Sequence, residues 1–270
     1  MTKFIDQLVS YGLENIAIAP WRAEHVLVAA RPIDAGEVIL TERPLVSVPD
    51  DEIGYPTFSW ALVDSILASA SITAQFYSLQ LHQTKFRVDM EDQKTERELS
   101  KKYRRSRDVI RKIYMSVTTN NVGYGGSVGR SVGHGIYPII SRANHSCAPN
   151  AAYNSTDITT KEVSLVALSP VATGEPVTWN YAGTAEFDAS DYVQRNFNLV
   201  DNFRFACACP KCQLEMPVEL ASKKDLVAHF DELAKAFIKE RLAQMLADDP
   251  TSEEAARLQG LVKTTRFSLN

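Results

Sequence analysis

Residues 133–154 read GHGIYPIISRANHSCAPNAAYN, and this stretch decides the fold of the chain. Two short runs rich in apolar residues, GIYPII at 135–140 and NAAYN at 150–154, enclose the polar element N-H-S-C. Short runs with β-branched and aromatic residues between turn residues predict strands. We therefore expect a short strand on each side of the element that begins at Asn144.

Short strands are also expected before and after this stretch. The segments that predict them are NIAIAP (15–20), HVLVAARPI (25–33), DAGEVIL (34–40), EVSLVAL (162–168) and EPVTWNY (175–181). Apolar residues recur at helical spacing from Phe58 to Leu67 and from Leu99 to Val117, which predicts helices between the two groups of strands. A glycine-rich loop is expected at 123–135, with no clear strand before it.

Helices are expected towards the end of the chain. A polar, helical stretch leads to Cys207, and a second helix after Pro217 carries an apolar face. The residues of that face are Leu226, Phe230, Leu233 and Phe237. Pro250 ends this helix, and Thr251 is expected to cap a last short helix.

This order divides the chain into five expected parts. They are the first β-rich part (1–50), a helical insertion (51–130), the second β-rich part (131–183), a cysteine-containing segment (184–214) and C-terminal helices (215–270). Strands that never alternate regularly with helices disfavour a doubly wound parallel sheet. The expected fold class is therefore α+β, built mostly of short strands.

The composition excludes several classes of protein. The chain of 270 residues is 45% hydrophobic and 23% charged, as in ordinary globular proteins. A net charge of -4 argues against nucleic acid as a direct ligand. No run of 18 apolar residues predicts a membrane span, and Asp6 and Glu14 interrupt the N-terminal apolar residues, unlike a secretory signal. We expect an intracellular protein. The basic run KKYRRSR at 101–107 fits a nuclear-import signal or a solvated helix face, so nucleus and cytosol both stay open.

The cysteines point to a metal. The four in the chain are Cys147, Cys207, Cys209 and Cys212, and the last three form C-x-C-x-x-C. Two disulfides would need a strained bridge inside that cluster, whereas four thiolates are what a structural Zn²⁺ needs. The alternative is four unrelated buried thiols. We expect zinc at a closed, structural site, which would tie the cysteine segment to the N-H-S-C element.

Three motifs in order carry a family resemblance. The first is the stretch at 133–150, the second is GEPVTWNY at 174–181, and the third is FRFACACPKC at 203–212. Together they resemble the SET-domain protein methyltransferases and, within them, the branch related to the SMYD proteins. The sequence SRANHSCAPNA at 141–151 is most similar to that of fungal members. The resemblance is firm over about 118–214 and thin over 15–50. It implies a SET fold of pseudoknotted small sheets, with a helical insertion, a post-SET zinc knot and C-terminal helices.

The resemblance also implies a reaction, the transfer of a methyl group from S-adenosylmethionine to a lysine amine of a protein. Tyr181 matches the active-site tyrosine of the family, whose hydroxyl and nearby backbone carbonyls line the pore through which the methyl passes. Much of the acceleration comes from positioning, worth up to ~7–11 kcal/mol in favourable cases. The alternative for Tyr181 is a tyrosine packed in the core.

The resemblance assigns further residues to the cofactor and the substrate. The expected cofactor contacts are Asn120, Ser141, Asn144, His145 and Phe205. Phe203 and Trp179 are expected in the lysine channel. A structural role is the alternative for His145, and packing around the zinc knot is the alternative for the two phenylalanines.

The chain departs from the family at the N-terminal cofactor loop. Glu24, His25 and Val26 stand where the family has a G-x-G pattern. Glycine there lets the backbone approach a ligand closely. The cofactor is therefore expected to bind weakly, differently or not at all. Arg142, which lies between the I-S and N-H-S-C elements, is a smaller departure.

Three functions remain open at this point. The first is a protein-lysine methyltransferase, the second a SET-fold binding module that has lost methyl transfer, and the third an enzyme that uses the same scaffold on a small molecule in specialised metabolism. A fold alone does not fix a function. Cofactor binding separates the first from the second, and a product assay with lysine peptides separates the first from the third.

Overall fold

A computed structural model describes residues 4–21, 24–50, 54, 57–81, 90–125, 131–155, 157–183, 185–203 and 205–217, with isolated positions at 232, 239 and 243. The chain divides into two compact units, Met1–Gly183 and Thr184–Asn270. The helices expected after Pro217 and at Thr251 lie outside the described residues. Within the described part, no helix has both the length and the apolar character needed to cross a bilayer.

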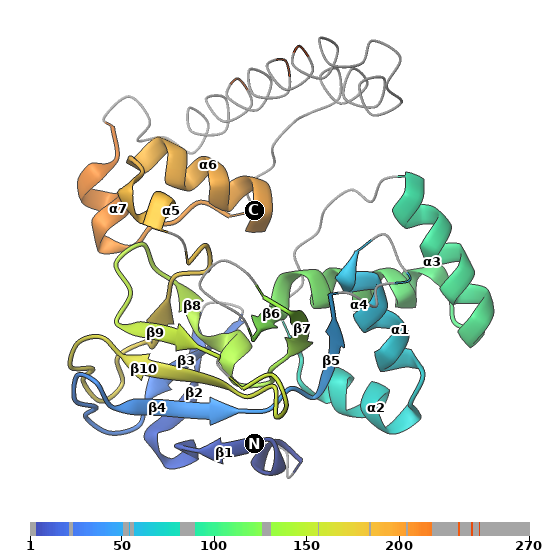
Figure 1. Ribbon diagram of the computed structural model, residues 1–270, viewed down its shortest axis with the longest axis horizontal. Coiled ribbons are helices and arrows are strands. Elements are labelled where there is room, and N and C mark those ends of the chain that lie inside the picture. Colours follow the sequence, from blue (N-terminus) through green and yellow to red (C-terminus); the bar gives the residue numbers. More distant parts are fainter. Residues whose placement is uncertain are drawn as a thin grey trace. The chain divides into compact units, whose positions relative to one another are not determined.

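The first unit contains small sheets made of short strands (Figure 1). The largest is antiparallel, and its strands in spatial order are β1 (Val9–Tyr11), β4 (Val38–Glu42), β10 (Val163–Ala167) and β9 (Ala151–Asn154). A second antiparallel sheet consists of β5 (Val46–Pro49), β7 (Gly133–Ile136) and β6 (Asn121–Tyr124). A hairpin joins β2 (Ile16–Trp21) to β3 (Glu24–Ala29), and β8 (Asn144–His145) pairs in parallel with β11 (Thr178–Trp179).

The sequence alternation in β10 explains how the largest sheet faces the core. Val163, Leu165 and Ala167 are buried, and the residues between them are half-buried. Successive side chains of a strand point to opposite faces, so this alternation turns one face inward. Leu165 lies opposite Leu40 of β4 and opposite Tyr153 of β9, which continues the apolar face across three strands.

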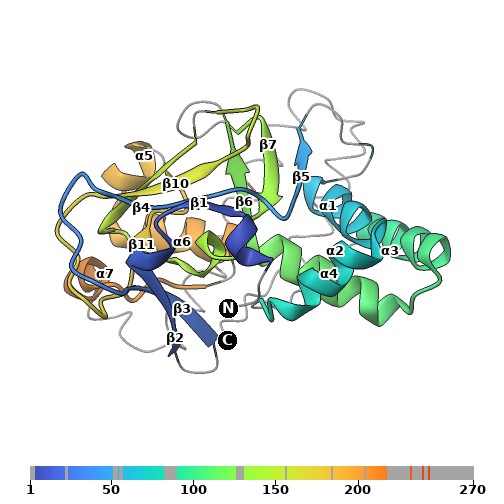
Figure 2. The same cartoon turned by 90° about the horizontal axis from the view of Figure 1, so that it is seen from below.

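Four helices follow β5 and form the insertion. They are α1 (Phe58–Leu67), α2 (Ala70–Ser78), α3 (Met90–Tyr103) and α4 (Arg107–Asn120). Serine hydroxyls cap two of them: Ser69 accepts from the backbone N–H of Ile72 at 3.3 Å, and Ser106 accepts from that of Val109 at 3.4 Å. Seen from below, the four helices gather on one side of the sheets (Figure 2).

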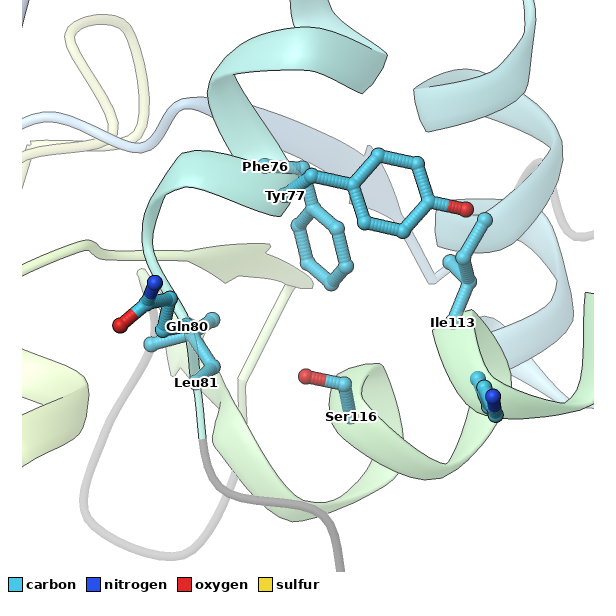
Figure 3. Close-up of a pocket in the computed structure, with 7 residues that line it drawn as sticks. Phe76, Tyr77, Gln80, Leu81, Ile113 and Ser116 are labelled. Atoms are coloured by element: carbon cyan, nitrogen blue, oxygen red, sulfur yellow. The ribbon is translucent and has the colours of Figure 1, made fainter. Parts of the chain in front are cut away.

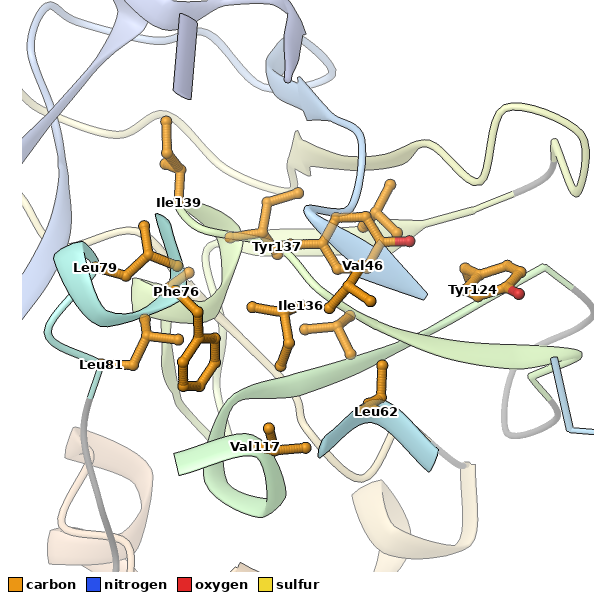
Figure 4. Close-up of a cluster of buried hydrophobic side chains, with 14 of the residues drawn as sticks. Val46, Leu62, Phe76, Leu79, Leu81, Val117, Tyr124, Ile136, Tyr137 and Ile139 are labelled. Atoms are coloured by element: carbon orange, nitrogen blue, oxygen red, sulfur yellow. The ribbon is translucent and has the colours of Figure 1, made fainter. Parts of the chain in front are cut away.

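The helices of the insertion share one hydrophobic core with the β5-β7-β6 sheet. Figure 4 shows side chains of this core from α1, α2, α4 and the three strands. Leu62, Val117 and Ile136 have no exposed surface, and burial of side chains of this size contributes ~1.5–3 kcal/mol each. The insertion is therefore an integral part of the first unit.

Two local expectations were wrong. The strand expected over GIYPII stops at Ile136, and the chain turns into a single 3-10 turn, η3 (Ile140–Arg142). The glycine-rich loop expected at 123–135 is wrong at both ends, because β6 runs directly from the end of α4 to Tyr124 and β7 begins at Gly133, while residues 126–130 lie outside the described residues. The pairing of β7 with β5 and with β6 also ends at Ile136, opposite Val46 and Asn121.

The second unit holds three short helices among the described residues. They are α5 (Ala185–Ala189), α6 (Tyr192–Phe203) and α7 (Pro210–Glu215). The helical stretch expected before Cys207 is confirmed. Pro210 begins α7, where its missing N–H and fixed backbone angle suit a first helical position.

Candidate functional site

The parallel pair β8–β11 brings two of the sequence motifs together. Asn144 lies opposite Thr178, and His145 lies opposite Trp179. The backbone N–H of Ser146 then donates to the carbonyl of Trp179 at 3.1 Å. The N-H-S-C element and the strand that leads to Tyr181 therefore lie side by side and are joined by backbone hydrogen bonds.

Asn150 fastens the end of the first motif to the start of the second. Its side-chain oxygen accepts from the backbone N–H of Thr178 at 2.8 Å. Its side-chain nitrogen donates to the carbonyl of Pro176 at 2.9 Å and to the carboxylate of Glu175 at 3.3 Å. Asn150 and Glu175, which both belong to the sequence motifs, therefore have a structural role: they hold the two motifs together.

The backbone carbonyl of Ala143 lies at the centre of the candidate site. It accepts from the Tyr181 hydroxyl at 3.0 Å and from the indole N–H of Trp179 at 3.1 Å. The Trp179 ring lies between two others, with centroid distances of 5.3 Å to Tyr153 and 5.0 Å to Tyr181. Burial raises the pKa of the Tyr153 hydroxyl. A backbone oxygen and three aromatic rings are thus assembled beside Asn144.

The imidazole of His145 is held on both sides. Its Nδ1 accepts from the backbone N–H of Tyr181 at 3.1 Å, so a neutral ring carries its hydrogen on Nε2. That nitrogen lies 3.3 Å from Sγ of Cys147. The buried ring therefore links the strand of Tyr181 to one of the cysteines.

Asn120 and Ser141 lie next to each other. Asn120 ends α4, and its carbonyl accepts from the Ser141 hydroxyl at 2.8 Å. The same hydroxyl lies 2.6 Å from the carbonyl of Tyr137, and the Asn120 side chain donates to the carbonyl of Ser116 at 2.7 Å. Two of the predicted cofactor contacts, Asn120 and Ser141, therefore lie side by side, and Ser141 comes shortly before the N-H-S-C element in the chain.

The segment expected to stand in place of the family's glycine loop is a regular strand. Val26 of β3 lies opposite Ala19 of β2, and both Val26 and Leu27 are buried. The backbone N–H of Val177 donates to the carbonyl of Leu27 at 2.9 Å. His25 is exposed. This part of the chain is held by backbone pairing and core packing.

The four cysteines form a cluster. Their sulfur atoms all lie within 4.8 Å of one another, and three of the four side chains are buried. A tetrahedral Zn²⁺ with bonds of ~2.3 Å to four thiolates needs sulfur–sulfur separations of ~3.8 Å, which this cluster accommodates. In the second unit, Phe203 and Phe205 come shortly before Cys207 in the chain, and their ring centroids are 6.4 Å apart.

Hydrogen bonds within the second unit hold the segment that carries Cys207, Cys209 and Cys212. Buried Asn196 of α6 accepts from the backbone N–H of Cys207 at 2.6 Å and donates to Sγ of Cys212 at 3.7 Å. The backbone N–H of Cys209 lies 3.4 Å from Sγ of Cys207. Donors directed at sulfur stabilise thiolates and are typical partners of metal-bound cysteine. The residues present therefore fit a structural zinc ion.

A small cavity lies elsewhere, between α2 and α4 (Figure 3). Its volume is about 40 Å³, and its lining includes Phe76, Tyr77, Leu81 and Ile113. None of the predicted site residues lines it, and drug-sized ligands occupy ~300–1,000 Å³. This cavity is too small for a nucleoside cofactor.

Comparison with known proteins identifies the family. Residues 24–182, more than half of the chain, match the SET domain. The chain therefore belongs to the SET domain family, and the small antiparallel sheets, the helices and the cysteine cluster agree with the fold expected from the motifs.

Its relatives are distant. The chain is 36% identical over 80 residues to a SET and MYND domain-containing protein of Dictyostelium discoideum, and 36% identical over 80 residues to the protein-lysine N-trimethyltransferase SMYD5 of Gallus gallus. Each match covers 30% of this chain, and the chain spans only 22% and 19% of the length of these two relatives. The solved SET domain of LSMT bound to lysine and AdoHcy aligns over 97% of this chain and 82% of that one, with 12% identity and a TM-score of 0.39.

Several residues of the site were missed by sequence reasoning. Ala143 contributes a backbone oxygen, which has no signature in the sequence. Asn196 lies outside every motif, and a buried asparagine in a polar helix is not distinguishable beforehand from an exposed one. Glu42 is also buried, at the end of β4, with its carboxylate directed at backbone N–H groups beside η3.

Proposed function

We propose that this chain catalyses the transfer of a methyl group from S-adenosylmethionine to a lysine amine of a protein. The observation that carries the proposal is the Tyr181 hydroxyl bound to the carbonyl of Ala143, directly beside Asn144 and His145. This arrangement supplies a tyrosine hydroxyl and a backbone carbonyl at one point, which is what the resemblance implies for a methyl-transfer pore. The similarity to a relative named as a protein-lysine N-trimethyltransferase supports the same reaction.

The residues of the site would act chiefly by positioning. S-adenosylmethionine, when bound, supplies an electrophilic methyl group on a sulfonium. Two donors, Tyr181 and Trp179, fix the direction of the Ala143 carbonyl, so it need not reorganise during the reaction. The stacked ring of Tyr153 holds Trp179 in place and extends an apolar wall that would exclude water beside a neutral amine.

We further propose roles for the residues around this centre. Asn144 and the backbone of His145 would hold the cofactor, because both ring nitrogens of His145 are already engaged within the fold. Asn120 and Ser141 would border the bound cofactor, Phe205 would pack near the adenine, and Phe203 with Trp179 would line the lysine channel. The cysteine cluster would hold a structural Zn²⁺ with no open position, and the ion would take no part in the reaction.

The first test is a calorimetric titration of purified, zinc-loaded protein with S-adenosylhomocysteine, the methyl-transfer product. Micromolar binding is expected, followed by transfer of labelled methyl from S-adenosylmethionine to lysine peptides. Tyr181→Phe should retain product binding and lose turnover. Absence of binding at millimolar concentration would contradict the proposal.

One observation favours a second candidate, a SET-fold protein without methyl transfer or with a small-molecule substrate. The segment at Val26 is a paired strand with a buried valine where the family has a glycine loop. A buried β-branched residue there leaves less freedom for close approach to a ligand. Binding of the product without transfer to any lysine peptide would favour a small-molecule substrate, and failure to bind would favour a binding module.

A further inference from the structure

The backbone that leads into the site depends on a buried carboxylate. Glu42 is the last residue of β4, and its side chain has no exposed surface. Its two oxygens accept from the backbone N–H of Ile139 at 3.0 and 3.1 Å, and one of them accepts from that of Ile140 at 2.9 Å. These donors begin the turn η3, where no backbone partner is available within the turn itself.

The other end of the same turn is held by Arg142. Its Nε donates to the carbonyl of Pro138 at 3.2 Å, and its Nη2 donates to the carbonyl of Leu79. Leu79 is the C-terminal cap of α2, where unpaired carbonyls favour a cation. The guanidinium therefore joins the turn to the helical insertion.

An ionised Glu42 would also attract the guanidinium of Arg142. Burial lowers the pKa of Arg142, and the charge of Glu42 acts against that change. Removing either side chain leaves buried backbone groups without a hydrogen-bond partner, so both positions are sensitive to substitution. Directly after Arg142 comes Ala143, whose carbonyl faces Tyr181 and Trp179.

We propose that Glu42 and Arg142 are positioning residues for the methyl-transfer site. The carboxylate fixes the start of η3 to the largest sheet, and the guanidinium fixes its end to α2, so that the carbonyl of Ala143 meets the hydroxyl of Tyr181. This inference rests on the proposed function. It adds two residues to the site, and it gives the helical insertion a part in the geometry of the site.

The test compares two substitutions at each position in the zinc-loaded full chain. Glu42→Met leaves two backbone donors unpaired, whereas Glu42→Gln keeps an accepting oxygen. Arg142→Met removes both bonds to carbonyls, whereas Arg142→Lys keeps a cation. Both methionine variants should weaken binding of S-adenosylhomocysteine at least ~10-fold, because a shift of η3 also moves Asn144, the proposed cofactor contact that follows it in the chain. Glu42→Gln should stay within ~3-fold of wild type, and Arg142→Lys should recover part of the loss.

A matched control is available in the insertion. Glu96 of α3 is equally buried and pairs with Arg107 at 2.5 Å and Arg111 at 2.9 Å. Glu96→Met should lower the unfolding midpoint while leaving the dissociation constant of the product unchanged. If it weakens binding as much as Glu42→Met does, the effect is general destabilisation and the proposal is wrong.

Amide hydrogen exchange provides a readout that does not require a ligand. Both methionine variants should speed exchange at Ile139, Ile140 and the Tyr181 amide, which is bonded to His145. Glu96→Met should not. Wild-type protein that fails to bind the product would overturn the proposed function, and the exchange data would still decide whether the pair positions the site. Wild-type affinity and unchanged Tyr181 exchange in Arg142→Met would overturn the positioning role, even if Glu42→Met does not fold.

Discussion

The buried carboxylate of Glu42 should make the stability of the protein fall as the pH rises. Burial raises the pKa of Glu42 from its ordinary value of 4.5 to about 8, although the N–H groups of Ile140 and Ile139 and the charge of Arg142 act in the opposite direction. Between those two values the unfolded chain has released the proton and the folded chain still holds it. The free energy of unfolding therefore decreases as the pH rises through this window. At about 1.4 kcal/mol for each pH unit, the full effect is ~5 kcal/mol.

The assay is urea unfolding of wild type and Glu42→Gln at intervals from pH 5 to pH 9. The glutamine cannot ionise, and other titrating groups contribute equally to both proteins, so the difference between the two free energies isolates Glu42. The variant should gain on the wild type steadily with pH, and it should be the more stable protein at pH 9. A difference that changes by less than about 1 kcal/mol over the whole range would refute the reasoning.

Four further changes test the site. Tyr181→Phe should cost at most ~1.5 kcal/mol of stability and lower turnover ~100-fold or more, measured by urea unfolding and labelled methyl transfer; unchanged turnover would remove this hydroxyl from the mechanism. Trp179→Phe keeps a ring but not the indole donor, so turnover should fall while the affinity for S-adenosylhomocysteine changes little; equal activity would show that the Ala143 carbonyl needs only one donor. Cys209→Ser should lose bound zinc in elemental analysis and destabilise the protein by an amount on the order of 10 kcal/mol; full stability without metal would disprove the structural site. Val26→Gly should cost ~2 kcal/mol because a buried side chain is lost, and tighter product binding despite that loss would mark this strand as the cofactor loop.

The sequence was most informative where periodicity and motif spacing act locally. The apolar spacing that predicted a helix from Phe58 to Leu67 matches α1, and the spacing up to Val117 matches α4. The strands β3 and β10 also follow directly from alternating or continuous apolar residues. Three motifs in order were sufficient to predict the SET family.

The sequence was least informative where distant segments decide the backbone. Nothing in GIYPII shows that the strand ends at Ile136, because the carboxylate that takes the next free N–H groups lies 97 residues earlier in the chain. The focus of the candidate site is a backbone carbonyl at Ala143, and its role depends on Trp179 and Tyr181. Arg142 stood out in the sequence as a departure from the family, but its partner at Leu79 belongs to the insertion, whose packing no motif describes.

The parallel pair β8–β11 has a consequence for the order in which the protein folds. Each of its strands has only two residues, so the pair by itself cannot offset the entropy lost when Asn144 and Thr178 are brought together. The hairpin of β9 and β10 lies between them, and closing it with Ala151 opposite Ala167 shortens the remaining loop. The site should therefore assemble after that hairpin and be among the first regions to open in the native state. A fluctuation that separates β9 from β10 would disperse the residues around Ala143 while the core between α1 and α4 stays intact.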